Sequence, residues 1–134
     1  MSMVPFQVKE YHMAKTILIV EDDTKNMTLF RDLLGVSGYS TILASGGKEG
    51  IELAKAKKPD LILMDIQMPG MDGLEATRIL KADATTSGIP VIALTAYAMK
   101  GDKERMLKAG CDGYLAKPID TDEFLQEVAK YLSK

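Results

Sequence analysis

The 134-residue chain has no tryptophan and only one cysteine, Cys111. A single thiol cannot form a disulfide within the chain or build a thiolate metal cluster, which indicates a reducing, cytoplasmic setting. An excess of positive charge is also missing, since 17 Lys and Arg residues stand against 19 Asp and Glu residues, giving a net charge of -2. Nothing in this balance supports a broad electrostatic grip on nucleic acid, so we expect no nucleic-acid partner.

Long hydrophobic runs are absent as well. The longest apolar runs fall far short of the roughly 20 residues that span a bilayer, so we expect no association with a membrane. Residues 1–13 contain Lys9 and Glu10 and no continuous apolar core, which argues against a signal peptide. We predict that residues 1–13 are a leader or extension without a role of its own, and that residues 14–134 form one domain.

What the chain does contain is an alternation of short aliphatic runs with longer amphipathic stretches. The runs at 16–20, 61–64 and 91–94 show no polar alternation, as expected of strands buried on both faces of a parallel sheet. Shorter strands are predicted at 40–44 and 113–116, and apolar residues at helical spacing predict a helix after each strand. We therefore predict an α/β fold with a doubly wound, five-stranded parallel sheet, flavodoxin-like (βα)5. The strand order 2-1-3-4-5 is expected from the fold class, because the sequence itself does not set the order.

Functional groups come directly after four of the predicted strands. The first strand is followed by Glu21 and Asp22, the third by Asp65, the fourth by Thr95 and the fifth by Lys117. In an open parallel sheet, ligands bind beyond the carboxyl ends of the strands. We therefore expect these side chains to meet at one edge of the sheet.

The expected cluster combines carboxylates with one hydroxyl group and one ammonium group. Oxygen ligands without His or Cys favour Mg2+ over Zn2+, and Mg2+ commonly completes its coordination shell with phosphate oxygens. Lys117 supplies a point charge suited to a phosphoryl group, and Thr95 supplies a hydroxyl donor. A carboxylate beside Mg2+ and a lysine can attack phosphorus and form an acyl phosphate. The sequence therefore predicts Mg2+-dependent phosphoryl transfer onto Asp65.

The stretches that carry these residues resemble the response-regulator receiver domains of two-component signalling. They are ILIVEDD (17–23), PDLILMDIQMPGMDG (59–73), IPVIALTA (89–96) and GYLAKP (113–118). The resemblance covers the whole chain apart from the leader, so residues 14–134 are expected to be the receiver domain. Segment 95–119 is more similar to stand-alone receivers of cell-division control, and to receivers attached to hybrid kinases, than to those of chemotaxis.

The resemblance implies a role for each group that handles phosphate or metal. Asp65 would be the phosphoacceptor, and Lys117 would bind the phosphoryl group. Mg2+ would be held by Glu21, Asp22, Asp65 and the backbone carbonyl of Gln67, with Asp22 the more direct ligand of the acidic pair.

The resemblance also implies a switch and a place for water attack. Thr95 would be the switch hydroxyl and Tyr114 the switch aromatic. Gln67 and Tyr97 flank the expected approach of water to the acyl phosphate, so we predict that both tune its hydrolysis. The family further implies that the peptide bond between Lys117 and Pro118 can be cis, which the sequence does not decide.

The chain ends one helix after Lys117, and no helix-turn-helix segment or basic stripe follows. We therefore expect a single-domain response regulator that takes a phosphoryl group from a histidine kinase or histidine phosphotransfer protein and signals by phosphorylation-dependent binding. The resemblance places the surface for the downstream protein on the fourth helix, fifth strand and fifth helix. Such a domain is not an enzyme acting on other molecules, because it catalyses only its own phosphorylation and dephosphorylation.

Two other classes of function remain open from the sequence. A Mg2+-dependent aspartyl-phosphate phosphatase would need a second acid-base carboxylate two residues after the nucleophile, where this chain has Gln67. A phosphorylation-independent binding module would be expected to have lost the acids, Thr95 or Lys117, and the sequence retains them all.

Overall fold

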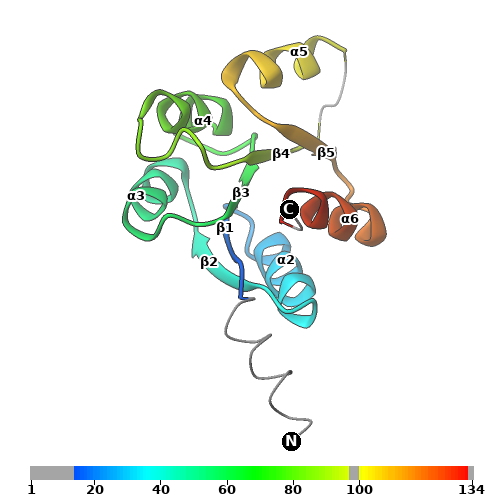
Figure 1. Ribbon diagram of the computed structural model, residues 1–134. Helices are drawn as coiled ribbons and strands as arrows, with labels where there is room; N and C mark the ends of the chain where they lie inside the picture. Colours follow the sequence, from blue (N-terminus) through cyan, green and yellow to red (C-terminus); the bar gives the residue numbers. More distant parts are fainter. Residues whose placement is uncertain (1–13, 97–99, 133–134) are drawn as a thin grey trace, which may run out of the picture.

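The computed structural model describes residues 14–96 and 100–132, in which strands and helices alternate along the chain (Figure 1). The elements are β1 (Thr16–Val20), α2 (Thr24–Val36), β2 (Ser40–Ala44), α3 (Gly47–Lys57), β3 (Leu61–Asp65), α4 (Gly73–Ala82), β4 (Val91–Thr95), α5 (Lys100–Ala109), β5 (Gly113–Ala116) and α6 (Thr121–Leu132). The fourth and fifth helices predicted from the sequence therefore correspond to α5 and α6. Within these described ranges, no helix is both long and apolar enough to cross a membrane.

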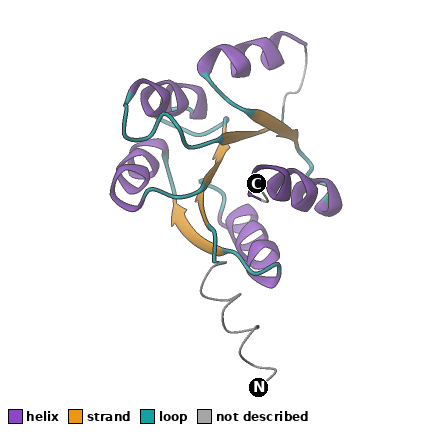
Figure 2. Ribbon diagram, in the orientation of Figure 1, coloured by secondary structure: helices purple, strands orange, loops and turns teal. Residues whose placement is uncertain are grey.

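The strands form one parallel sheet in the order β2-β1-β3-β4-β5, as Figure 2 shows in orange. Both the parallel sheet and the order 2-1-3-4-5 confirm the predicted fold. The three central strands are buried along nearly their whole length, which explains why their sequences lack polar alternation.

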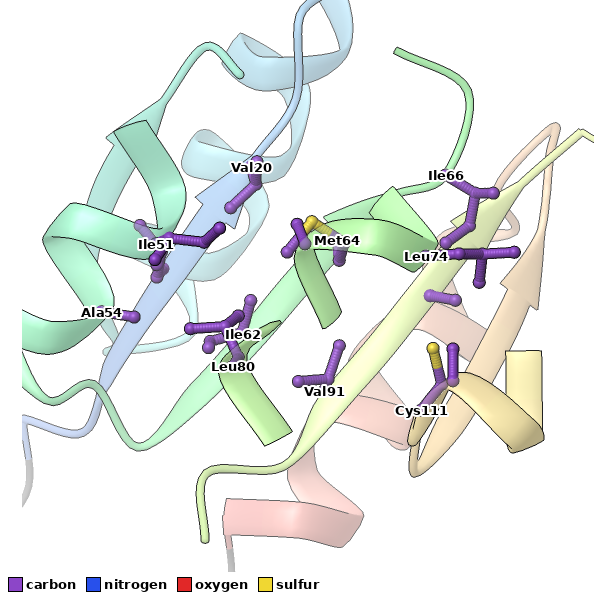
Figure 3. Packing of buried hydrophobic residues seen from close by; sticks show 14 of the residues in the cluster. Val20, Ile51, Ala54, Ile62, Met64, Ile66, Leu74, Leu80, Val91 and Cys111 are labelled. Atoms are coloured by element: carbon purple, nitrogen blue, oxygen red, sulfur yellow. The ribbon is translucent and has the colours of Figure 1, made fainter. Parts of the chain in front are cut away.

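The helices cover the sheet in two layers, with α3, α4 and α5 on one face and α2 and α6 on the other (Figure 1). Successive residues of a strand point to opposite faces, so Leu18 and Val20 join the first layer while Ile17 and Ile19 join the second. Figure 3 shows the core beneath α3, α4 and α5. On the opposite face, the rings of Phe30 and Phe124 stack with their centroids 5.2 Å apart and join α2 to α6.

Strands β3 and β4 each extend one residue beyond the predicted run. Asp65 pairs with Leu94, and Thr95 pairs with Ala116, so both polar residues are the last residues of their strands instead of the first residues of the following loops. The sequence underestimates these strands because a polar residue interrupts the apolar run, whereas the backbone pairing continues through it. Both side chains consequently start from rigid backbone.

Helix α4 begins immediately beside the end of β3. The Gly73 N–H donates a hydrogen bond to the Ile66 carbonyl at 3.1 Å, and a Cβ at Gly73 would collide with the backbone carbonyl of Asp65. Asp72 caps the helix by accepting a hydrogen bond from the Glu75 N–H at 2.9 Å. The absence of a side chain at Gly73 therefore lets α4 approach the backbone of Asp65 closely.

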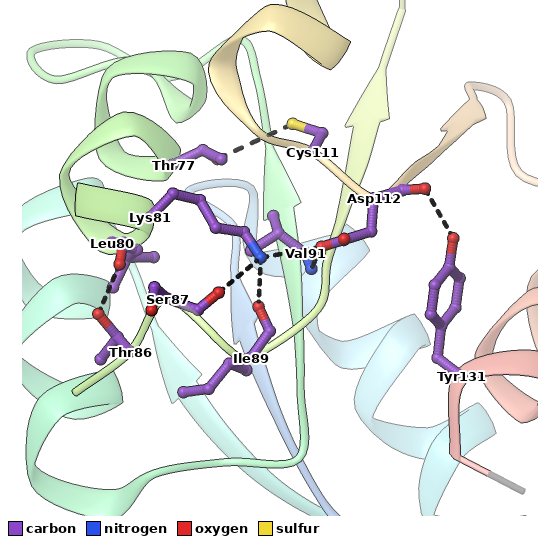
Figure 4. A network of polar contacts seen from close by, with 10 residues as sticks. All are labelled: Thr77, Leu80, Lys81, Thr86, Ser87, Ile89, Val91, Cys111, Asp112 and Tyr131. Carbon is purple, nitrogen blue, oxygen red and sulfur yellow. Dashed lines mark hydrogen bonds and ion pairs between the residues drawn. The ribbon is translucent and has the colours of Figure 1, made fainter. Parts of the chain in front are cut away.

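A polar cluster ties the amino ends of β4 and β5 to the neighbouring helices (Figure 4). The Lys81 Nζ donates to the Ile89 carbonyl at 2.8 Å and to the Asp112 Oδ2 at 3.0 Å. The same carboxylate oxygen accepts from the Val91 N–H at 2.8 Å, and the Tyr131 hydroxyl donates to the Asp112 carbonyl at 2.8 Å. We call these five residues the amino-edge cluster.

Candidate functional site

Three carboxylates meet at the opposite edge of the sheet, where the strands end. Glu21 and Asp22 follow β1 directly, and the register that pairs Val20 with Met64 brings them beside Asp65. One carboxylate oxygen from each of these acids lies within 4.8 Å of the others. We call Glu21, Asp22 and Asp65 the acidic cluster. The predicted convergence of these side chains is thus present in the structure.

Burial distinguishes the members of the acidic cluster. Glu21 and Asp65 are each only 1% exposed, whereas Asp22 faces solvent. The Lys117 Nζ lies 3.2 Å from the Asp65 Oδ1 and 3.5 Å from the Glu21 Oε1. One ammonium group therefore faces two buried carboxyl groups, and their combined negative charge is only partly balanced.

Glu21 shows the consequence of this imbalance. Its Oε2 accepts a hydrogen bond from the Asp23 N–H at 3.1 Å, but its Oε1 is buried and has no hydrogen-bond partner among the described residues. Burial, followed by the influence of Asp65, raises the pKa of Glu21 from 4.5 to about 7, and Lys117 offsets only part of this rise. A buried acceptor without a donor is uncommon in folded proteins and calls for a ligand or a proton.

The donor set fits a hard divalent cation. Carboxylate oxygens are the ligands that Mg2+ prefers, and a cation next to the orphaned Glu21 Oε1 would compensate the buried negative charge. Asp23, the next acid in the sequence, serves the helix instead of the acidic cluster. It caps α2 by accepting from the Lys25 N–H at 2.8 Å and the Asn26 N–H at 3.2 Å.

The side chain of Gln67 bridges the loop after β3 to the end of β4. Its Nε2 donates to the Thr95 Oγ1 at 3.1 Å, and its Oε1 accepts from the Ala96 N–H at 3.0 Å. Its backbone N–H donates to the Asp65 Oδ1 at 3.2 Å. From the sequence we predicted that the Gln67 backbone carbonyl binds Mg2+ and that Gln67 tunes hydrolysis of the acyl phosphate. The side-chain bond to Thr95 was not predicted, because no sequence pattern links residues 28 positions apart.

The remaining predicted site residues lie around β5 and β4. Tyr114 is half-buried and packs against the core under α3, α4 and α5, and the Lys103 Nζ lies 5.7 Å from the centroid of its ring. The peptide bond between Lys117 and Pro118 is cis, which settles the alternative left open by the sequence. Tyr97 lies outside the described residues, so its predicted role stays a prediction.

A family model described as the response regulator receiver domain matches residues 17–129. The chain belongs to this family. The receiver domain is 52% identical over 120 residues to the polar-differentiation response regulator DivK of Brucella anthropi, in an alignment that covers 90% of this chain and 98% of that relative. The family predicted from the sequence motifs is therefore confirmed, and with it the function of a phosphoryl-accepting signalling domain.

Solved structures of receiver domains have the same fold. The receiver domain of a sensor histidine kinase from Pseudomonas aeruginosa PAO1 is 36% identical, with a TM-score of 0.84 over 90% of this chain and 99% of that chain. That structure carries a magnesium ion coordinated in its active-site cleft. The receiver domain of a histidine kinase from Syntrophus aciditrophicus is 35% identical, with a TM-score of 0.83 over 90% of this chain and 91% of that chain.

Proposed function

We propose that this receiver domain accepts a phosphoryl group on Asp65 from a histidine kinase or histidine phosphotransfer protein and signals by phosphorylation-dependent binding. The observation that carries the proposal is the pairing of a buried Asp65 with Lys117 at 3.2 Å, beside a buried carboxylate oxygen of Glu21 that makes no hydrogen bond among the described residues. One divalent cation would balance the excess negative charge of this arrangement, and Lys117 together with that cation would attract the oxygens of a phosphoryl group.

Glu21, Asp22, Asp65 and the backbone carbonyl of Gln67 are the groups that we assign to hold Mg2+. The acidic cluster and the orphaned Glu21 Oε1 support this assignment, as does the magnesium ion in the Pseudomonas receiver domain. When bound, the metal supplies positive charge that stabilises the oxygens of the transferring phosphoryl group.

The transfer itself is a substitution at phosphorus. An oxygen of the Asp65 carboxylate attacks, the phosphorus–nitrogen bond of the donor phosphohistidine breaks, and the imidazole leaves with its electron pair and takes up a proton. Lys117 balances charge on the phosphoryl oxygens, and the Thr95 hydroxyl donates a hydrogen bond to one of them once the acyl phosphate has formed. Hydrolysis of the acyl phosphate returns the carboxylate, so the domain catalyses only its own phosphorylation and dephosphorylation.

Hydrolysis is tuned by Gln67 and Tyr97 in this proposal. The Gln67 side chain makes one bond to Thr95 and one to Ala96, and its second N–H and second oxygen lone pair can orient a water molecule while these bonds hold. Tyr97 obstructs the water by its bulk, and Tyr97→Ala is expected to speed decay of the acyl phosphate about 3- to 10-fold.

The signal leaves the domain through Thr95 and Tyr114 and is received by a protein partner on α5, β5 and α6. Leu107 on α5 is 54% exposed and Tyr114 is half-buried, which offers apolar area on this surface. We further propose that the protein works in the cytoplasm as a single-domain regulator, with residues 14–134 as the receiver and residues 1–13 without a role in phosphorylation.

Incubation with acetyl phosphate and Mg2+ followed by intact-mass and peptide mass spectrometry tests the phosphoacceptor. The wild type should gain one phosphoryl group on Asp65, and Asp65→Asn should gain none. Asp122→Asn, which changes an exposed acid in the first turn of α6, is the matched control and should be labelled like the wild type. Equal labelling of Asp65→Asn would overturn the assignment.

A further inference from the structure

Gln67 contacts the phosphoacceptor and the switch hydroxyl at the same time. Its backbone N–H bonds to the Asp65 Oδ1 at 3.2 Å, while its side-chain Nε2 bonds to the Thr95 Oγ1 at 3.1 Å. The other side-chain atom, Oε1, accepts from the Ala96 N–H at 3.0 Å. The carboxamide thus forms hydrogen bonds with two successive residues at the carboxyl end of β4, Thr95 and Ala96.

Hydrogen bonds, more than packing, fix the position of this carboxamide. Gln67 and Thr95 both line a cavity of about 290 Å3 that extends between α4 and α5, where Leu74 and Met106 form part of its wall. Thr95 is 1% exposed, whereas Gln67 is exposed, so packing constrains the carboxamide less than it constrains Thr95. The two bonds of the carboxamide oppose a movement of Thr95 relative to the loop after β3.

We propose that the Gln67 side chain is a latch: a positioning residue that holds Thr95 in its resting place and opposes its movement toward a phosphoryl group on Asp65. This inference rests on the proposed function, since it assumes that Thr95 moves when Asp65 is phosphorylated. The carboxamide holds both the hydroxyl and the next backbone N–H, so Thr95 cannot shift relative to Gln67 without weakening at least one bond. Bonds made only in the resting arrangement stabilise that arrangement.

The backbone bond to Asp65 gives phosphorylation a direct means of acting on the latch. An Asp65 carboxylate is a charged acceptor for the Gln67 N–H, and forming the acyl phosphate removes the charge from the carboxyl group and crowds its oxygens. The backbone that anchors the carboxamide is therefore altered at the moment when Thr95 is required by the phosphoryl group. One residue couples the chemical step to release of the switch.

Beryllium trifluoride, a phosphoryl mimic that binds a carboxylate oxygen, tests the latch without hydrolysis. At saturating Mg2+, Gln67→Met keeps the length of the side chain but makes neither bond, and we expect its affinity for beryllium trifluoride to rise about 3- to 10-fold, the change that loss of one net hydrogen bond produces. Gln67→Asn, whose amide is one carbon too short to reach β4, should show a rise in the same direction. Gln126→Met on the exposed surface of α6 is the control and should match the wild type.

A second measurement reads the latch in the metal-free protein. Amide hydrogen exchange at Ala96 should be faster in Gln67→Met, because its N–H loses the Gln67 acceptor. In a Thr95→Val background, Gln67→Met should raise the affinity for beryllium trifluoride less than it does in the wild type, since the hydroxyl that the latch holds is gone.

Each outcome decides between the latch and the proposed function. Unchanged or lower affinity of Gln67→Met for beryllium trifluoride, or an equal rise in the Thr95→Val background, overturns the latch. Unchanged exchange at Ala96 overturns it as well, because the contact is then absent in solution. A wild type that neither binds beryllium trifluoride nor is labelled on Asp65 overturns the proposed function instead.

Discussion

A lysine lies beside carboxylate groups both at the amino ends of the strands, the amino edge, and at their carboxyl ends, the carboxyl edge. Only at the amino edge do the lysine and the carboxylate balance each other. At the amino edge, Lys81 donates to backbone carbonyls and to the Asp112 carboxylate, which also accepts from the Val91 N–H (Figure 4). At the carboxyl edge, Lys117 faces both Asp65 and Glu21, and the Glu21 Oε1 has only this 3.5 Å ion pair and no hydrogen bond among the described residues.

The amino-edge cluster therefore stabilises the fold, whereas the acidic cluster has excess negative charge that a bound cation would balance. The charges of Lys81 and Asp112 balance each other, and both groups are hydrogen-bonded. The amino-edge cluster therefore joins α4, β4, the start of β5 and α6 without a bound ion. Two buried acids beside one lysine are destabilising by themselves. Buried ionisable groups with unbalanced charge and a shifted pKa, as found here, are typical of functional sites.

The largest expected effect is on metal binding at the carboxyl edge. Asp22→Ala removes a charged oxygen ligand, and we expect Mg2+ affinity measured by isothermal titration calorimetry to fall roughly 100-fold, or about 2.7 kcal/mol. Lys117→Ala removes a competing cation, so its Mg2+ affinity should equal or exceed that of the wild type. Asp112→Asn, at the other edge, is the control and should bind Mg2+ normally. Abolished Mg2+ binding in folded Lys117→Ala would contradict this division of roles.

The next effect is on stability at the amino edge. Asp112→Ala removes the acceptor for both the Lys81 ammonium and the Val91 N–H, and should lower the free energy of unfolding by about 2 kcal/mol. Asp112→Asn keeps one oxygen acceptor and should lose roughly half of that. Urea unfolding of metal-free protein measures both. Asp65→Asn, which relieves Glu21 of a like charge, should instead leave the protein as stable as the wild type or more so; a loss as large as that of Asp112→Ala would erase the contrast between the edges.

The carboxyl edge was predictable from the sequence, while the amino edge was not. Glu21, Asp65 and Lys117 each come at the end of an apolar run, and the common direction of parallel strands is enough to bring them together. Lys81 and Asp112 belong to a helix end and a loop that no pattern relates, and their contact depends on how α4 packs beside β4 and β5. Sequence periodicity predicts which face of a helix or strand is buried and where that element ends. It does not predict which side chains of different elements contact each other.

The same limit applies inside the site. The sequence indicated that Gln67 and Thr95 follow neighbouring strands, but the bond between them depends on a loop conformation. That conformation is shaped by Gly73, which lets α4 begin against the backbone of Asp65 and Ile66. The predicted strands β3 and β4 were each one residue too short for a related reason. The apolar pattern stops at a polar residue, whereas the backbone pairing includes it.

The pH dependence of stability sharpens the comparison further. The folded protein raises the pKa of Glu21 from 4.5 to about 7, chiefly through burial, so between these pH values the folded state holds a proton that the unfolded state has lost. Stability of the metal-free protein should therefore fall as the pH rises through this interval. Glu21→Gln lacks the titration, so its free energy of unfolding should exceed that of the wild type at pH 8, with little difference near pH 4.5.

Urea unfolding in EDTA across this pH range, repeated with Mg2+, measures the titration. Mg2+ should stabilise the wild type more than Glu21→Gln, because the cation takes the place of the proton beside the carboxylate. A difference between the two proteins that stays constant with pH would show that Glu21 does not titrate as its burial requires.

The smallest expected effect returns to the amino edge. Tyr131→Phe removes one hydrogen bond, from the Tyr131 hydroxyl to the Asp112 carbonyl at 2.8 Å, and should lower the free energy of unfolding by about 0.5–1 kcal/mol. Because this acceptor belongs to the backbone, it persists in Asp112→Ala, so the losses of the two variants should add in the double variant to within about 0.5 kcal/mol. Urea unfolding of both single variants and the double variant measures the coupling. A coupling well above that value would mean that the Asp112 side chain sets the position of its own carbonyl, and that the amino-edge cluster acts as one cooperative unit instead of two separate ties.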